Sequence, residues 1–373
     1  MGELKVMSVP KQVDIAITGK CNLACQYCFY ADEMVARTNL PKERWLSFFE
    51  ELGRLGVMTV CLTGGEVFTR PDLFELIDGI IANRMRYQLL SNGTMITEET
   101  LAQFAIGKRR QRLDSIQISV DGSSADVHNL SRPKSFGRAL RGLKLLKEAG
   151  FPVTVRVTVN RYNVDDLENV AHLLLDEVGL SSFTTNEAYA CGATDRMEGN
   201  IILSPAQREK AMVVLTRLAD QYDHRISATA GPLIYASEVK MMDELLSSGQ
   251  TGLAGRGTLS ACGGVFSKIA VHHDGTIIPC HVLPTLILGK IGVDDLQEIW
   301  LHHPTLIALR ERQKMPMSSL DTCQNCRFQG FCTGGCPGGA VYAYGNFNAR
   351  NPMDCTRILR GEDPFFKLPS DIN

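Results

Sequence analysis

From residue 12 to about residue 222, short apolar segments alternate with amphipathic helical segments. The apolar segments have the length of strands, and they are VDIAIT (13–18), VMTVCL (57–62), YQLLS (87–91), SIQISV (115–120), VTVRVTV (153–159) and SSFTTN (181–186). Parallel strands need long crossovers, so six such β/α units predict a parallel sheet with helices outside it. The pattern fits two architectures, an open doubly wound sheet and a full or partial TIM-like barrel, and does not choose between them.

Start and stop residues mark the helices between these strands. A helix is predicted to begin with Pro41 and to end near Gly56. A second has Ser135 as its N-cap and Gly150 as its stop, and a third covers 204–222.

After about residue 223 the pattern changes. A helical stretch (231–249) is followed by a glycine-rich link and by a hairpin over 268–280 that turns at Asp274-Gly275. One further helix is predicted over 293–313, and the remaining chain is loop-rich. We therefore expect two domains, residues 1–235 and residues 236–373, the second stabilised by bound metal.

Composition excludes several classes of protein. A net charge of −2 argues against a nucleic-acid-binding module, and the basic run at 107–112 is interpreted as a solvated loop. No apolar run has the length of a membrane span, and the first twenty residues lack a signal-peptide core. We expect a cytoplasmic protein.

The 12 cysteines are unusual for such a protein, because a reducing cytoplasm does not maintain disulfides. Three lie at Cys21, Cys25 and Cys28, and seven lie between Cys262 and Cys355. Tight clusters of this kind indicate metal sites. Of the two isolated cysteines, Cys61 is interpreted as a core residue, and Cys191 lies outside both clusters.

The first cluster follows the first strand, at the edge where parallel α/β folds bind ligands. Thiolates from Cys21, Cys25 and Cys28 can hold three irons of a [4Fe–4S] cube and leave the fourth iron open to a small molecule. A structural zinc site would need a fourth ligand, and this loop offers none. A bacterial ferredoxin run would have different spacing.

The segment CNLACQYCFY resembles the Cx3CxΦC signature of radical S-adenosylmethionine (SAM) enzymes, with Tyr27 as its aromatic residue. The resemblance implies a partial (β/α)6 barrel of class α/β. It also implies that the open iron chelates the amino and carboxylate groups of SAM. An electron from the cluster would cleave SAM and form a 5′-deoxyadenosyl radical, which abstracts hydrogen from a substrate.

Further segments match this family. Gly64, Gly65 and Glu66 resemble its GGE motif, in which Glu66 would accept hydrogen bonds from the SAM ammonium group and the glycines would admit the methionine. Val67 stands where many relatives have proline. Ser119 and Asp121 match the SxDG segment near the SAM ribose and carboxylate.

Four more residues on this side of the chain have open roles. Asn92 and Arg156 are further candidates for SAM contacts, and Arg156 is equally interpreted as an ion-pair partner inside the barrel. His128 and Arg132 are interpreted as residues that cap or pair locally.

The C-terminal cysteines resemble the SPASM extension of this family, which carries two auxiliary iron–sulfur clusters. The family pattern assigns the distal cluster to Cys323, Cys326, Cys332 and Cys355, and the nearer cluster to Cys262, Cys280 and Cys336. Seven thiolates cannot fill two four-thiolate cubanes. We hypothesise an open or substrate-ligated iron, with Cys191 and His281 as alternative ligands, whereas His272 and His273 are interpreted as surface residues.

The resemblance implies an oxidoreductase or lyase that modifies a ribosomally synthesised precursor peptide (RiPP maturation), with three iron–sulfur clusters and SAM. One such peptide modification is the excision of a tyramine unit, which leaves an α-keto-β-amino acid. The alternatives are thioether or carbon–carbon crosslinking, sulfatase maturation, and haem-type or pyrroloquinoline quinone biosynthesis. A non-catalytic electron-transfer protein is disfavoured, because it would not need the GGE and SxDG segments.

Sequence features also bear on partners and on the acid or base. His281 stands where sulfatase maturases have an aspartate, which argues against that activity. The first strand begins too early for a fused peptide-recognition (RRE) domain, so a separate recognition protein is expected, with a flavodoxin- or ferredoxin-type reductant. Glu187, Tyr189 and His281 are the candidates for a substrate-side acid or base.

Overall fold

The computed structural model describes residues 6–196 and 201–362, and its centre is one ten-stranded sheet of order β10-β9-β8-β1-β2-β3-β4-β5-β6-β7. The strands are β1 (Gln12–Thr18), β2 (Thr59–Gly64), β3 (Arg86–Ser91), β4 (Leu113–Ser119), β5 (Val153–Val159), β6 (Phe183–Glu187), β7 (Ile226–Ala228), β8 (Lys268–Val271), β9 (Thr276–Ile278) and β10 (Gly289–Lys290). Strands β1 to β7 are parallel to their neighbours. The sheet ends at β10 and β7 without closing, which confirms a partial barrel.

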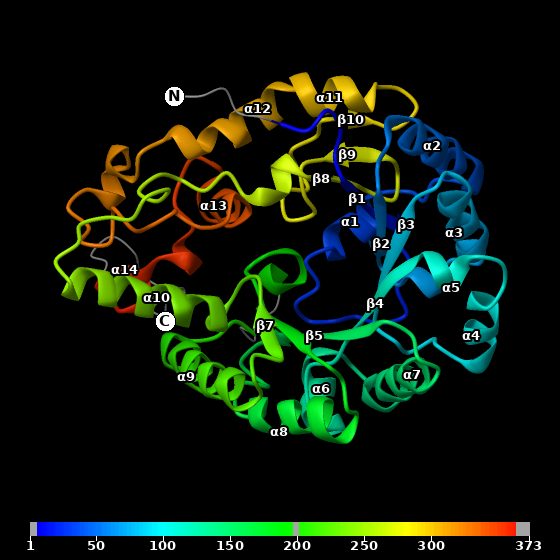
Figure 1. Ribbon diagram of the computed structural model, residues 1–373, viewed down its shortest axis with the longest axis horizontal. Coiled ribbons are helices and arrows are strands. Elements are labelled where there is room, and N and C mark those ends of the chain that lie inside the picture. The colour runs from blue at the N-terminus through cyan, green and yellow to red at the C-terminus, as the bar shows by residue number, and fades with distance from the viewer. Residues whose placement is uncertain (1–5, 197–200, 363–373) are drawn as a thin grey trace.

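Helices cover the outer side of this sheet, as Figure 1 shows for α2 to α9. The α-helices are α1 (Ala31–Ala36), α2 (Lys42–Leu55), α3 (Leu73–Ala82), α4 (Glu98–Phe104), α5 (Arg109–Arg112), α6 (Ala125–Ser131), α7 (Phe136–Glu148), α8 (Leu167–Ala171), α9 (Pro205–Gln221), α10 (Pro232–Ser247), α11 (Leu296–His302), α12 (Pro304–Glu311), α13 (Pro337–Tyr344) and α14 (Thr356–Leu359). No helix among the described residues is both long and apolar enough to cross a membrane.

Strand residues alternate between two environments. Val13, Ile15 and Ile17 of β1 pack with Trp45 of α2 in the main hydrophobic core. Because successive side chains of a strand point to opposite faces, the intervening residues face the inside of the partial barrel. That face is polar: Arg156 donates to Gln117 Oε1 over 2.9 Å.

Cys61 is buried, as expected of a core residue, but it lies among charged groups. Burial raises the pKa of its thiol to about 12, and the nearby carboxylate of Asp14 contributes to the shift. Lys268 and Arg156 act in the opposite direction. Cys61 therefore belongs to the polar inner face rather than to the apolar core.

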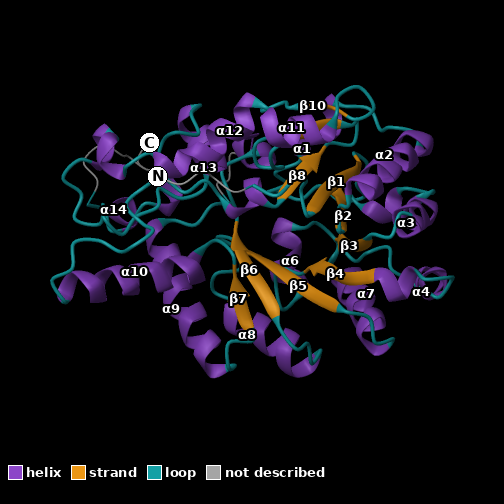
Figure 2. Cartoon of the chain, turned by 45° about the horizontal axis from the view of Figure 1, so that its top comes forward, coloured by secondary structure: helices purple, strands orange, loops and turns teal. Residues whose placement is uncertain are grey.

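The C-terminal hairpin extends the same sheet. Strand β8 lies parallel to β1, and β9 pairs antiparallel with β8, as the Asp274-Gly275 turn predicts. Figure 2 shows β8 beside β1. The predicted domain boundary at 235/236 falls within α10 and stays a prediction, and the outer ends of the two predicted domains lie outside the described residues.

Several local predictions were wrong. The helix expected over 293–313 is two helices, because His303, before Pro304, has extended backbone (φ −64°, ψ 125°). Ser135 occupies the N-cap position of α7, as predicted, but its side chain makes no capping hydrogen bond, and its hydroxyl donates instead to the Arg132 carbonyl over 2.7 Å. The basic run at 107–112 is partly buried, because Arg109 pairs with Asp78 at 2.6 Å. The short strand β7 was not predicted.

Candidate functional site

The loop that carries Cys21, Cys25 and Cys28 begins three residues after β1 ends at Thr18. Its three thiols are close enough to affect one another. Burial raises the pKa of Cys28 to about 11, and the Cys25 and Cys21 thiols contribute to the shift. The loop is fixed by its backbone, since the Gln26 N–H donates to the Ser131 carbonyl over 3.0 Å.

The two glycines of the GGE segment lie against this part of the chain. A Cβ on Gly64 would stand 2.3 Å from the Thr18 carbonyl oxygen, and one on Gly65 would stand 2.1 Å from that of Lys20. Real Cβ atoms do not approach backbone so closely. The Gly65 and Glu66 N–H groups donate to the same two carbonyls, each over 2.8 Å. The glycines thus let β2 fix the start of the cysteine loop.

Glu66 is buried (1% exposed) with three protein donors around its carboxylate. Ser91 Oγ and the Phe68 N–H donate to Oε1 over 2.8 and 3.3 Å, and the Asn92 N–H donates to Oε2 over 2.7 Å. Burial raises the pKa of Glu66, and these hydrogen bonds oppose the shift. A carboxylate has about four acceptor sites, so Glu66 keeps room for one further donor.

Asn92 connects this carboxylate to the cysteine loop. Its side-chain Nδ2 donates to Asn22 Oδ1 over 2.8 Å, and Asn22 Nδ2 donates to Thr94 Oγ1 over 2.8 Å. Asn22 follows Cys21 directly, so the end of β3 helps to position the first cysteine.

Asp121 is fully buried, and its carboxylate connects β5 to residues beside the cysteine loop. Its Oδ2 accepts from Arg132 Nε over 2.6 Å and from the Tyr27 hydroxyl. Its Oδ1 accepts from the Thr158 N–H over 2.8 Å. Ser119 ends β4 two residues earlier and lies beside Arg156 in the register of β4 and β5.

Arg132 is the main site residue that the sequence did not single out as functional. Its guanidinium lies 5.2 Å from the centre of the Tyr27 ring, and its Nη1 is 3.7 Å from Cys25 Sγ. Arg132 pairs with Asp121, in agreement with the local pairing expected from the sequence, and it also lies close to the Cys25 thiol. Burial raises the pKa of Cys25, and Arg132 opposes that shift, which favours the thiolate that an iron ligand must be.

His128 supports Asp121 from behind. Its Nδ1 accepts the Asp121 N–H over 3.1 Å, and its Nε2 lies 2.9 Å from Ser135 Oγ. Burial lowers the pKa of His128 to about 4, so the native imidazole is neutral at pH 7.

We expect His128 to make folding stability depend on pH. Between pH 6.5 and pH 4 the unfolded chain binds a proton that the native state does not bind, so stability falls by about 1.4 kcal/mol per pH unit as the pH decreases. Above pH 6.5 the contribution is constant. His128→Asn keeps an acceptor but does not titrate there. Denaturant unfolding of both proteins across this range, at equal iron content, should show a flatter profile for the variant, and two parallel profiles would contradict the expectation.

His272 and His273 are fully buried, which corrects their interpretation as surface residues. The Tyr30 hydroxyl lies 3.2 Å from His272 Nδ1 and 2.8 Å from His273 Nδ1. Tyr30 stands two residues after Cys28, so this contact joins the cysteine loop to the C-terminal hairpin. The hairpin sequence predicts its turn, but only the pairing of β8 with β1 brings these side chains together.

The three acid or base candidates have different environments. Glu187 is in a buried ion pair, because Arg208 Nε of α9 donates to both of its carboxylate oxygens over 2.9 and 3.2 Å. Tyr189 lies against Gly339, where an added Cβ would clash with its hydroxyl. Burial lowers the pKa of His281 to about 3, and a hydrogen bond with the Asp14 backbone acts in the opposite direction. Glu187 is therefore already paired, and His281 is neutral.

Cys191 lies close to the cysteine loop. Its segment contacts the loop backbone, because the Ala193 N–H donates to the Cys28 carbonyl over 3.0 Å. Cys191 itself is almost completely buried.

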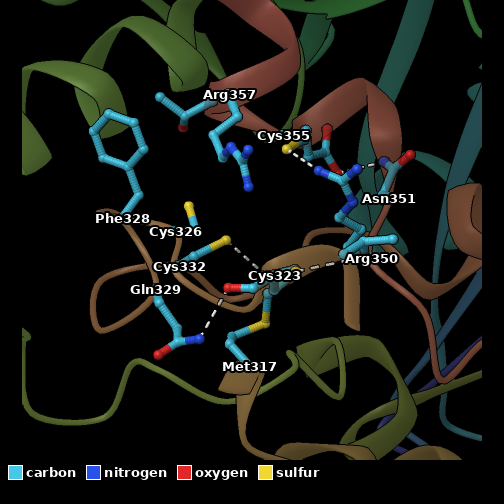
Figure 3. A pocket seen from close by; sticks show the side chains of 14 residues that line it. Met317, Cys323, Cys326, Phe328, Gln329, Cys332, Arg350, Asn351, Cys355 and Arg357 are labelled. Atoms are coloured by element: carbon cyan, nitrogen blue, oxygen red, sulfur yellow. Dashed lines mark hydrogen bonds between the residues drawn. The ribbon is translucent and has the colours of Figure 1, made fainter. Parts of the chain in front are cut away.

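Four C-terminal thiols line a single cavity, shown in Figure 3. They are the thiols of Cys323, Cys326, Cys332 and Cys355, and the first and last of these residues are 32 positions apart in the sequence. The Gly334 N–H donates to Cys332 Sγ over 3.3 Å, and Arg350 Nη1 donates to Cys355 Sγ over 2.7 Å. Hydrogen bonds to thiolate sulfur are typical of iron–sulfur sites. The four thiols thus fit a cube with four cysteine ligands.

A second group contains the thiols of Cys262, Cys280 and Cys336. Burial raises the pKa of Cys280 to about 12, and the other two thiols contribute to the shift, so the three are neighbours. No set of three or more His, Cys, Asp or Glu side chains in the described part of the chain converges on a single point where one metal ion would bind. A cluster needs no such point, because each thiolate binds a different iron.

Comparisons with known proteins identify related families and a shared fold. The Radical SAM superfamily profile matches residues 15–174, and that of the SPASM iron–sulfur cluster-binding domain matches 262–327. The chain is 28% identical to PqqA peptide cyclase of Ruegeria pomeroyi (95% of this chain, 90% of that protein) and 26% identical to AdoMet-dependent heme synthase of Methanosarcina barkeri (94% and 97%). The crystal structure of Streptococcus suis SuiB bound to precursor peptide SuiA has the same fold, with TM-score 0.71, 16% identity, and 94% and 77% coverage.

Proposed function

The chain belongs to the radical SAM superfamily and carries a SPASM domain, and from this we propose that it modifies a ribosomally synthesised precursor peptide. The observation that carries the proposal is the similarity to PqqA peptide cyclase over almost the whole of both chains. The three-thiol loop and the four-thiol cavity would supply ligands that such an enzyme needs.

The residues of the first site fit SAM and its cluster. Cys21, Cys25 and Cys28 would hold the cluster, with Arg132 favouring their thiolate form. Glu66, with one acceptor site free, would receive the SAM ammonium group. When both are bound, the reduced cluster and SAM would supply a 5′-deoxyadenosyl radical for hydrogen abstraction from the substrate.

Asp121 would act mainly as a positioning residue, because both of its carboxylate oxygens already accept hydrogen bonds from the protein. It holds Tyr27 and Arg132 beside the cysteine loop. Gly64, Gly65 and Asn92 position the same loop from β2 and β3, while Ser119 and Arg156 remain candidates for direct SAM contacts.

The auxiliary sites would hold two clusters. Together with the cluster that binds SAM, the protein would hold three. Cys323, Cys326, Cys332 and Cys355 would bind one, and Cys262, Cys280 and Cys336 the other. The latter has three thiols for four irons, so we propose that its fourth iron is open or is ligated by substrate. His281, which follows Cys280 directly, and Cys191 are the alternative protein ligands.

The finer reaction is proposed as backbone excision of a tyramine unit, which leaves an α-keto-β-amino acid. A separate recognition protein would present the peptide, and a flavodoxin or ferredoxin would supply electrons. The similarity to AdoMet-dependent heme synthase favours a second candidate, tailoring of a haem-like tetrapyrrole.

Co-expression tests the proposal directly. We expect a small peptide encoded beside this gene to change mass when it is produced with this protein under anaerobic conditions, and to lose one tyramine unit if excision is the reaction. Co-expression with Cys25→Ala should leave the peptide unchanged. An unmodified peptide, together with a changed absorption spectrum of an added tetrapyrrole, would instead support the second candidate.

A further inference from the structure

Two arginines stand among the residues that line the four-thiol cavity, Arg350 and Arg357. Arg350 is 4% exposed, and its Nη1 donates to Cys355 Sγ over 2.7 Å. Figure 3 shows its guanidinium directed at that sulfur. A buried cation thus forms a direct hydrogen bond with one of the four thiols.

The local fold fixes this contact. Arg350 and Cys355 are joined by a tight turn, in which the Cys355 N–H donates to the Pro352 carbonyl over 3.3 Å. Asn351 anchors the turn, since its N–H donates to the Gly334 carbonyl over 2.7 Å. The donor and the sulfur are therefore held in place together.

The charge of Arg350 also reaches a second thiol of the same cavity. Burial raises the pKa of Cys323, and Arg350 opposes that shift. Arg357 acts in the same direction on Cys326, where burial is again the largest cause of the raised pKa. Positive charge from Arg350 and Arg357 therefore lies close to the four-thiol group.

The three-thiol group has a different arginine environment. Arg312 lies near Cys336 and Cys262, but its nitrogens donate to carbonyl oxygens. They bond Phe347 O at 2.5 Å, Ala349 O at 2.8 Å and Gly335 O at 3.2 Å, and a further bond goes to Ser260 O. Its hydrogen bonds tie loops together rather than reaching sulfur.

We propose that Arg350 is a positioning residue that raises the reduction potential of the cluster held by Cys323, Cys326, Cys332 and Cys355. A hydrogen bond and a positive charge at sulfur stabilise the more negative, reduced cluster. This inference rests on the cluster ligands named under the proposed function.

The test is a redox titration of reconstituted full-length protein, followed by electron paramagnetic resonance. The signal that disappears in Cys323→Ala identifies the four-thiol cluster. We expect Arg350→Gln to lower its potential so that the ratio of reduced to oxidised cluster at a fixed potential falls about tenfold, which corresponds to ~59 mV for one electron. Arg350→Lys, which keeps the charge, should recover part of the shift.

The matched control is Arg327→Gln, because Arg327 is exposed and pairs with Glu362 at 2.7 Å. It removes the same charge from the same region and should leave the potential unchanged. An unchanged potential in Arg350→Gln, an equal shift in Arg327→Gln, or loss of the cluster in both Arg350 variants would each overturn the inference. Survival of every auxiliary signal in Cys323→Ala would instead overturn the ligand assignment.

Discussion

Replacement of Cys25 by alanine is expected to lower the formation of 5′-deoxyadenosine by more than about a thousandfold, a difference of about 4 kcal/mol in activation free energy. The reason is that Cys25 is the middle thiol of the loop after β1 and the one that Arg132 approaches. Two thiols cannot hold the cube that the site requires. The measurement is chromatography of the products formed from SAM and dithionite by anaerobically reconstituted protein.

The matched control is Cys61→Ala, which also removes a buried thiol from the inner face of the sheet. Cys61 lies beside Asp14, Lys268 and Arg156 rather than with the cysteine loop. This variant should retain iron and SAM cleavage close to those of the parent protein. Undiminished 5′-deoxyadenosine in Cys25→Ala, or equal loss in both variants, would contradict the assignment of the loop.

The strands were predictable because their signal is contiguous. The segment 153–159 is a strand from its first to its last residue, and the parallel order follows from the crossovers between strands. The break at Pro304 had a local signal, since proline disfavours a helical residue before it. Strand β7 had little signal, because three residues carry almost no periodicity.

The site was predictable where chemistry is local in sequence, and less so where it depends on the fold. Cys21, Cys25 and Cys28 form a spacing that can be read directly. His273 meets Tyr30 across 243 positions because β8 pairs with β1. No periodicity or motif carries that contact.

Arg132 and Arg350 show a related difficulty. Both lie close in sequence to an ion-pair or hydrogen-bond partner, yet a charged residue in a loop is usually solvated, so the sequence alone does not indicate that they approach a thiol. Burial decides the matter, and burial comes from packing of distant segments. The ion pair of Glu187 has the same origin, because its partner Arg208 comes from α9.

Loss of the Asp121 carboxylate is expected to lower the free energy of unfolding by about 3–5 kcal/mol, as for other buried ion pairs broken on one side. In Asp121→Ala the Arg132 guanidinium, whose side chain is 11% exposed, would remain buried without its carboxylate. The Thr158 N–H and the Tyr27 hydroxyl would lose their acceptor as well. Asp121→Asn, which keeps an oxygen for Thr158 but no charge, should have an intermediate effect.

Denaturant unfolding of a double-mutant cycle measures this coupling. Asp121→Ala combined with Arg132→Met should cost clearly less than the sum of the two single changes, because the double variant leaves no unpaired charge. Arg217→Met, which breaks the exposed pair with Glu168, is the control and should cost at most about 1 kcal/mol. If Asp121→Ala cost no more than this control, the carboxylate would not be what holds Tyr27 and Arg132 beside the cysteine loop.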